Sequence, residues 1–124
     1  METPPGKHSL GRLLKATRYS WQGAREAFRT EAAFREEIYA ALIMIPFALW
    51  IDVSGVERAL LIASVLFVII VELLNTAVEV VVDRISPEHH ALSGHAKDLG
   101  SAAVLTSLML AFSTWTCVLV PHYF

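Results

Sequence analysis

One stretch of the sequence, residues 59–83, most constrains how this chain can fold. Its first half is almost entirely apolar, and its second half carries Glu72, Asn75, Glu79 and Asp83 among Leu and Val residues. In a helix these four positions fall within an arc of roughly 80° on one face. A charged carboxylate in hydrocarbon is costly, so we expect this acidic stripe to face other helices or a wet cavity and to mark function. The alternative is a structural role, in which Glu72 and Asn75 join helices by hydrogen bonds.

The composition is typical of an all-α membrane protein with a single domain, 1–124. Of the 124 residues 55% are hydrophobic, and the mean hydropathy of +0.51 is too high for an ordinary soluble domain. The net charge of −2 argues against nucleic acid as a partner. The single cysteine, Cys117, excludes an intrachain disulfide and a multi-cysteine metal site.

Hydropathy and helical periodicity divide the chain into segments. The apolar run 38–51 makes only about 21 Å of helix, so residues 32–37 are needed to cross a core of roughly 30 Å. Ser54 and Glu57 have the spacing of a capping box that starts the next helix. The segment 9–29 is basic and amphipathic, which suits a helix on a membrane surface. The alternative is a soluble helix packed on a core. The predicted segments are a frayed start at 1–8, an amphipathic surface helix at 9–29, spans at 32–51, 56–83 and 96–120, and a cytoplasmic loop at 84–95.

The distribution of basic residues predicts the orientation. Most Lys and Arg residues precede the first span, and Arg84 and Lys97 lie between the second and third spans. The amino terminus is therefore expected in the cytoplasm and the carboxyl terminus outside. This topology puts Glu31, Glu79 and Lys97 at the cytoplasmic boundary. Glu72 lies about two helical turns deeper.

Four blocks in one order carry a resemblance to a known family. They are Glu72-x-Leu-Asn-Thr-Ala-Val-Glu-x-x-Val-Asp83, Lys15-Ala-x-x-Tyr-Ser-Trp21, Glu31-Ala-Ala-Phe-Arg35, and Leu92-Ser-Gly-His-Ala-Lys-Asp-Leu-Gly-Ser-Ala-Ala-Val104. The chain resembles the small bacterial integral-membrane diacylglycerol kinases, of the Gram-negative type. The resemblance implies a helical-bundle homotrimer in the inner membrane, with active sites shared between neighbouring subunits. His95 departs from the pattern, which has arginine there, and His122-Tyr-Phe extends it.

The resemblance also implies a reaction and its residues. It implies transfer of phosphate from ATP, with Mg²⁺, to the sn-3 hydroxyl of diacylglycerol, giving phosphatidic acid. Glu72 and Asn75 match the catalytic positions, and Glu31 and Glu79 match the metal-binding carboxylates. The nucleotide-contacting positions correspond to Arg12, Tyr19, Glu31, Glu79, Glu88, His89, His90, Lys97 and Asp98. The lipid-contacting positions correspond to Arg12, Trp21, Arg25, Phe28, Ala33, Phe34, Arg35, Glu36, Glu37, Trp50, Ile51, Asp52, Arg58, Glu72, Ser101 and Trp115.

The chemistry of these side chains agrees with the implied roles. Carboxylates, together with phosphate oxygens, are suitable ligands for Mg²⁺. Lys97 offers phosphate a point charge. The apolar neighbours of Glu72 disfavour its charged form, which suits a general base working near neutral pH. His89, His90 and His95 could suggest a metal, but without a firm ligand spacing we interpret them as solvated loop residues.

Three other functions are compatible with parts of the sequence. An undecaprenol kinase shares the core motif, which does not discriminate between lipid tails. A small proton- or cation-conducting oligomer would line its pore with Glu72, Asn75 and Glu79. A membrane scaffold would not need carboxylates at membrane depth.

Overall fold

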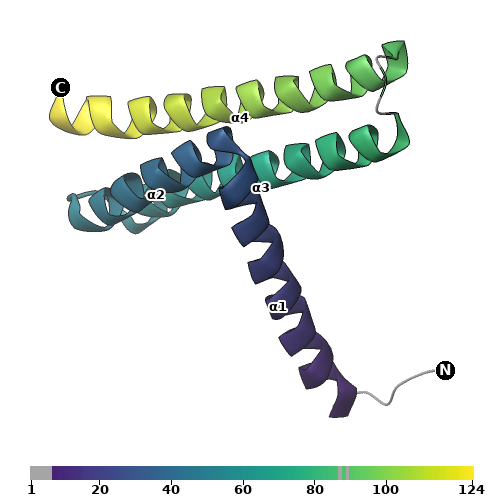
Figure 1. The fold of residues 1–124 in the computed structure, drawn as a ribbon. Helices are drawn as coiled ribbons and strands as arrows, with labels where there is room; N and C mark the ends of the chain where they lie inside the picture. Colours follow the sequence, from purple (N-terminus) through teal and green to yellow (C-terminus); the bar gives the residue numbers. More distant parts are fainter. Residues whose placement is uncertain (1–6, 87, 89) are drawn as a thin grey trace.

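The described part of the chain, residues 7–86, 88 and 90–124 of a computed structural model, consists of four α-helices. They are α1 (Lys7–Thr30), α2 (Ala32–Trp50), α3 (Gly55–Ile85) and α4 (Ala91–Tyr123). The helices α2, α3 and α4 lie along a common direction, whereas α1 projects away from them at a steep angle (Figure 1). The prediction of an all-α chain is confirmed.

Two of the described helices, α3 and α4, are long and apolar enough to cross a membrane. Most residues of their apolar windows are not buried within the chain, unlike those of a core helix in a soluble protein. The exposed side chains include many large apolar ones, such as Leu42, Ile70 and Phe112. A water-soluble chain would not leave so much apolar surface uncovered, so the fold is that of a helical membrane protein. The shorter α2 carries Arg35, Glu36 and Glu37 in its first two turns, and its role as the first membrane span, 32–51, stays a prediction.

The corner between α1 and α2 is held by Arg35. Glu31 is the single extended residue between the two helices, with φ −113° and ψ 111°. The Arg35 guanidinium reaches back and donates from Nη1 to the carbonyl oxygens of Phe28 (3.0 Å) and Arg29 (3.1 Å) at the end of α1. These carbonyls have no partner inside their own helix, so Arg35 acts as a cap. The ring of Phe28 also meets Tyr39 edge-on at 5.8 Å.

Because α2 is much shorter than α3 and α4, the molecule has two parts along its length. The helix α2 is about 28 Å long and α3 about 46 Å, at 1.5 Å per residue. Both run from the same turn, so the hairpin of α3 and α4 extends well beyond the start of α2 (Figure 1). One part therefore contains three helices, and the other is a two-helix extension that ends in the α3–α4 turn.

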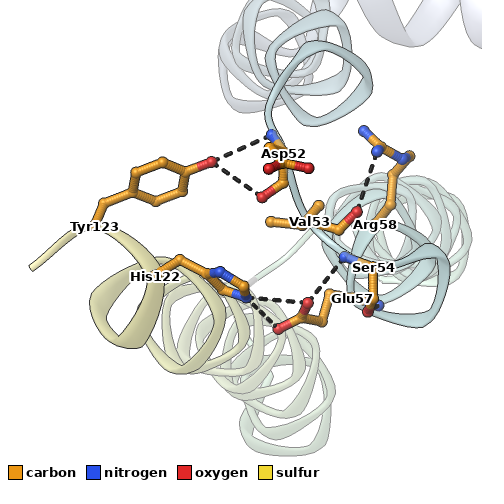
Figure 2. A network of polar contacts seen from close by, with 7 residues as sticks. All are labelled: Asp52, Val53, Ser54, Glu57, Arg58, His122 and Tyr123. Carbon is orange, nitrogen blue, oxygen red and sulfur yellow. Dashed lines mark hydrogen bonds and ion pairs between the residues drawn. The ribbon is translucent and has the colours of Figure 1, made fainter.

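The end of α4 is fastened to the turn between α2 and α3 (Figure 2). The Tyr123 hydroxyl donates to the Asp52 carbonyl oxygen and accepts from the Asp52 backbone N–H, both at 3.2 Å. His122 Nε2 lies 2.9 Å from a carboxylate oxygen of Glu57. Glu57 also completes the predicted capping box with Ser54, which is confirmed by reciprocal bonds of 2.9 and 3.1 Å.

Arg58 closes the carboxyl end of α2 from the other side of the same turn. Its guanidinium donates to the carbonyl oxygens of Ala48, Ile51 (3.1 Å) and Val53 (3.3 Å), whose residues are all buried. Below the turn Leu61 and Val118 pack with these residues in the core. The contacts explain why a short turn can hold three helix ends together.

Replacing Arg58 with methionine should destabilise the fold. Methionine keeps an apolar stem but leaves the carbonyl oxygens of a shielded turn without their charged donor, at a cost of about 2–4 kcal/mol. We expect the thermal unfolding midpoint of the detergent-solubilised protein to fall by several degrees. Arg18→Met, on the exposed face of α1, is the matched control. Equal midpoints for the two variants would contradict the capping role.

Three predicted boundaries differ from the structure. Helix α1 begins at Lys7, inside the segment predicted to be frayed. The predicted loop 84–95 is shorter because α3 reaches Ile85 and α4 begins at Ala91, where His90 Nδ1 accepts the Leu92 N–H at 3.1 Å. Helix α4 also continues through Pro121 to Tyr123. A proline in the last turn removes one N–H donor, and the contacts of His122 and Tyr123 hold that turn in place.

Candidate functional site

The Glu72 end of the acidic stripe faces the interior of the three-helix part, whereas Asp83 at its other end is exposed. Glu72 is 5% exposed, and the negative charges of Glu37, Glu79, Glu31 and Glu36 all act on it. These carboxylates come from α2, α3 and the corner before α2, so the fold brings charges of three segments within electrostatic range of Glu72. The expectation that Glu72 turns away from lipid is confirmed, because a single chain already covers it.

One turn along α3, Asn75 is hydrogen-bonded within the stripe. Its amide nitrogen Nδ2 donates to Glu79 Oε1 at 3.3 Å. Its Oδ1 is buried, and within the described residues no hydrogen-bond donor reaches it. The predicted catalytic role of Asn75 stays a prediction, and the bond seen here is to Glu79.

The two-helix extension contains a polar cavity. It has a volume of about 260 Å³ between the end of α3 and the start of α4. Lys97 Nζ and Asp83 Oδ1 form an ion pair across it at 2.7 Å. Three of the predicted nucleotide-contacting residues, Glu88, His90 and Lys97, line the cavity. Val82, Asp83, Ser86, Ser93 and Gly94 complete its wall.

Ser86 and Ser93 were not among the residues predicted for the site. Ser93 lies three residues after His90 and four before Lys97, on one face of α4. That spacing could have indicated Ser93 if the loop had been predicted as helix from Ala91. Ser86 follows the last turn of α3, and its hydroxyl donates to the Glu88 carbonyl oxygen at 3.1 Å.

An apolar cavity fills the corner between α1 and α2. Its volume is about 290 Å³. Four predicted lipid-contacting residues, Trp21, Arg25, Phe28 and Phe34, line it together with Ala24 and Ile38. The structure therefore gathers residues from two separate sequence blocks around one apolar space.

A second apolar space lies between α2, α3 and α4. This groove has a volume of about 410 Å³ and is lined at its ends by Glu37 and Trp115. Its floor includes Val65 and Val68 of α3, which share a helix face with Glu72 at the next turn. Trp115 is not free to turn, because its Nε1 donates to the Leu61 carbonyl oxygen (3.2 Å) and to Ser64 Oγ (3.1 Å).

The remaining predicted lipid-contacting residues lie elsewhere. Trp50, Ile51 and Asp52 line an apolar cavity of about 640 Å³ at the opposite end of α2. Arg58 is engaged by backbone carbonyls at that end. Ala33 and Glu36 are exposed at the start of α2, Arg35 caps α1, and Ser101 is exposed on α4.

Some predicted nucleotide-contacting residues are not brought to the polar cavity. Arg12 and Tyr19 are exposed on α1, which projects away from the bundle (Figure 1). Asp98 is exposed on α4, and His89 lies outside the described residues. Among the described residues no group of three or more His, Cys, Asp or Glu could hold a metal ion. The carboxylate pair Glu31 and Glu79 stays a predicted site.

The chain is similar to known proteins over most of its length. Residues 18–119 match a family described as prokaryotic diacylglycerol kinase. The chain is 53% identical to the diacylglycerol kinase of Escherichia coli strain K12 over 112 residues, which is 90% of this chain and 92% of that protein. It is 50% identical to the diacylglycerol kinase of Pseudomonas aeruginosa over 115 residues, 93% of this chain and 94% of the relative. A diacylglycerol kinase of Helicobacter pylori is 36% identical over 122 residues, 98% and 95% of the two chains.

Proposed function

This chain belongs to the prokaryotic diacylglycerol kinase family, and on that premise we propose how its residues carry out the reaction. The protein is a lipid phosphotransferase that phosphorylates diacylglycerol with ATP. The hydroxyl of the lipid attacks the terminal phosphorus of ATP, the hydroxyl proton leaves, and phosphatidic acid and ADP result. The match to this family over most of the chain supports this conclusion. The burial of Glu72 near an apolar groove supports Glu72 as the group that takes the proton.

The proposed location is the bacterial inner membrane, with the amino terminus in the cytoplasm. The three-helix part is about 28 Å long, close to the roughly 30 Å of a hydrocarbon core. The two-helix extension and its polar cavity would then stand in the cytoplasm, where ATP is found. Its exposed charges, including Asp83, Arg84 and Glu88, support that assignment.

Glu72 is the proposed general base. Its buried position, with apolar groove residues one and two turns away, excludes bulk water from the carboxylate. A base within hydrogen-bond reach of the lipid hydroxyl would take its proton as the bond to phosphorus forms.

Glu79 and Glu31 are the proposed ligands of Mg²⁺. Carboxylate oxygens suit this hard cation, which also takes phosphate oxygens and water. Asn75 occupies Oε1 of Glu79, so the second oxygen of that carboxylate stays available. When bound with ATP, Mg²⁺ would neutralise charge on the phosphates during transfer.

The polar cavity is the proposed place of the nucleotide phosphates. At about 260 Å³ it holds only part of a nucleotide. Lys97 would exchange its Asp83 partner for phosphate, because a phosphate carries more negative charge than a carboxylate. Glu88 and His90 line the same space and would contact the rest of the nucleotide.

The lipid is proposed to enter along the corner between α1 and α2. Both the corner cavity and the groove are apolar, and Glu37 lines the groove. The residues at the far end of α2, Trp50 to Arg58, would contact the opposite leaflet instead. One leaflet spans about half of the roughly 30 Å core, so one lipid cannot touch both ends of α2.

A homotrimer with shared sites is proposed for the assembly. Arg12 and Tyr19 lie on α1, which projects away from the other helices of its own chain (Figure 1). If they contact the nucleotide, α1 must bring them to a neighbouring subunit. The extensive exposed apolar surface of α4 supports contacts between subunits as well as with lipid.

An ion-conducting oligomer is less well supported. Pore-lining carboxylates would face the axis of an assembly, but Glu72 is covered inside a single chain.

Undecaprenol kinase differs from this proposal only in the acceptor. Its expected site would be the same, so the acceptor has to be tested directly.

The test is phosphate transfer in mixed micelles from labelled ATP with Mg²⁺. Diacylglycerol and undecaprenol are offered separately and together. We expect labelled phosphatidic acid, and at least a tenfold preference for diacylglycerol at equal mole fraction. Preferential labelling of undecaprenol would overturn the acceptor and keep the site. No labelling of either lipid by a well-assembled protein would overturn the kinase function.

A further inference from the structure

The helices α3 and α4 meet closely at Gly100 and Asn75. A Cβ atom added at Gly100 would overlap Asn75 Oδ1, and Asn75 Cγ would lie 3.2 Å from it. The three atoms nearest to that added Cβ all belong to Asn75. Gly23, which also lies inside a helix, has open space at the same place. The side chain of Asn75 therefore occupies the space that a side chain at Gly100 would need.

The contact sets the direction of the Asn75 amide. Because an added Cβ would take the place of a Cα hydrogen, one Gly100 Cα–H bond points at Oδ1. Such a Cα–H···O contact is a weak hydrogen bond that recurs where helices pack. It reaches the amide oxygen that is otherwise buried without a donor among the described residues. With the oxygen held against α4, Nδ2 is left pointing along α3 to Glu79 Oε1.

We propose that Gly100 is a positioning residue, which acts through Asn75 to orient the Glu79 carboxylate. The inference rests on the proposed role of Glu79 as a ligand of Mg²⁺. A donor on one oxygen fixes the rotation of the carboxylate and would leave the other oxygen to bind the cation. Partners of this kind change metal affinity or activity by about 10- to 100-fold when they are removed.

The test is Gly100→Ala, with Gly23→Ala as the matched control. The added methyl meets the far end of a flexible side chain, so the helices keep their contact and the amide swings away. We expect the Mg²⁺ concentration for half-maximal activity to rise about tenfold. The KM for diacylglycerol should change less than twofold. Gly23→Ala should behave as wild type.

A spectroscopic measurement makes the inference independent of catalysis. The side-chain NH₂ signal of Asn75, identified by its loss in Asn75→Ala, is recorded without Mg²⁺ or ATP. It should shift in Gly100→Ala and stay in place in Gly23→Ala. An unmoved signal, or an unchanged Mg²⁺ requirement in an active Gly100→Ala, would overturn the proposal. If the wild type were inactive while the Asn75 signal still shifted in Gly100→Ala, the kinase function would be refuted and the Gly100–Asn75 contact would be kept.

Discussion

Glu72→Gln is expected to lose phosphate transfer to diacylglycerol by about 100- to 10,000-fold, the range for a general base. Glutamine has nearly the same shape and cannot accept the hydroxyl proton. Because Glu72 is covered by its own chain and is surrounded by other carboxylates, losing its charge should not loosen the fold. The loss should therefore fall on kcat, with the KM for ATP changed by less than threefold.

The control for Glu72→Gln is the same change at Glu26, on the exposed side of α1. Glu26 forms a surface ion pair with Arg29, which contributes little. Its variant should keep wild-type activity. Added Mg²⁺ should not restore the Glu72 variant. If Glu72→Gln kept more than a tenth of the wild-type kcat while well assembled, Glu72 would not be the base.

Local patterns in the sequence predicted much of the fold. The spacing of Glu72 and its neighbours predicted which face of α3 turns inward, and the burial of Glu72 agrees. The Ser54 and Glu57 pair predicted the start of α3, because a capping box needs only residues that are close in sequence. Periodicity and capping are both properties of a single helix, and so one sequence is enough to find them.

Contacts between distant segments could not be predicted in this way. His122 meets Glu57 across 65 positions and Tyr123 meets Asp52 across 71, and both contacts depend on the relative lengths of α3 and α4. Those lengths were uncertain because the predicted loop 84–95 was too long and α4 was expected to stop before Pro121. The sequence alone therefore indicates no partner for these tail residues.

The candidate site shows the same division between local and distant information. Resemblance supplied the identities of the lipid-contacting residues but not their grouping in space. The structure separates Trp21 and Phe34 at one end of α2 from Trp50 and Asp52 at the other. Gly100 is a further example, since a small residue in an apolar helix gives no sign of which partner it accommodates until α3 is packed beside it.

Glu79→Gln is the second variant expected to have a large effect, and its response to Mg²⁺ should differ from that of Glu72→Gln. Glutamine keeps an oxygen that can accept the Asn75 N–H bond, so the local structure should persist. It removes the negative charge that a hard divalent cation prefers. At low millimolar Mg²⁺ we expect activity to fall about 100-fold.

The concentration dependence separates the roles of the two carboxylates. If Glu79 holds the cation, the loss is one of affinity, so raising Mg²⁺ or substituting Mn²⁺ should recover part of the activity. A base variant lacks a proton acceptor, which no cation concentration supplies. If Glu79→Gln and the wild type reached half-maximal activity at the same Mg²⁺ concentration, the cation would be held by other residues. A shifted midpoint in Glu79→Gln beside an unshifted one in Glu72→Gln would divide cation binding and proton transfer between two turns of one helix.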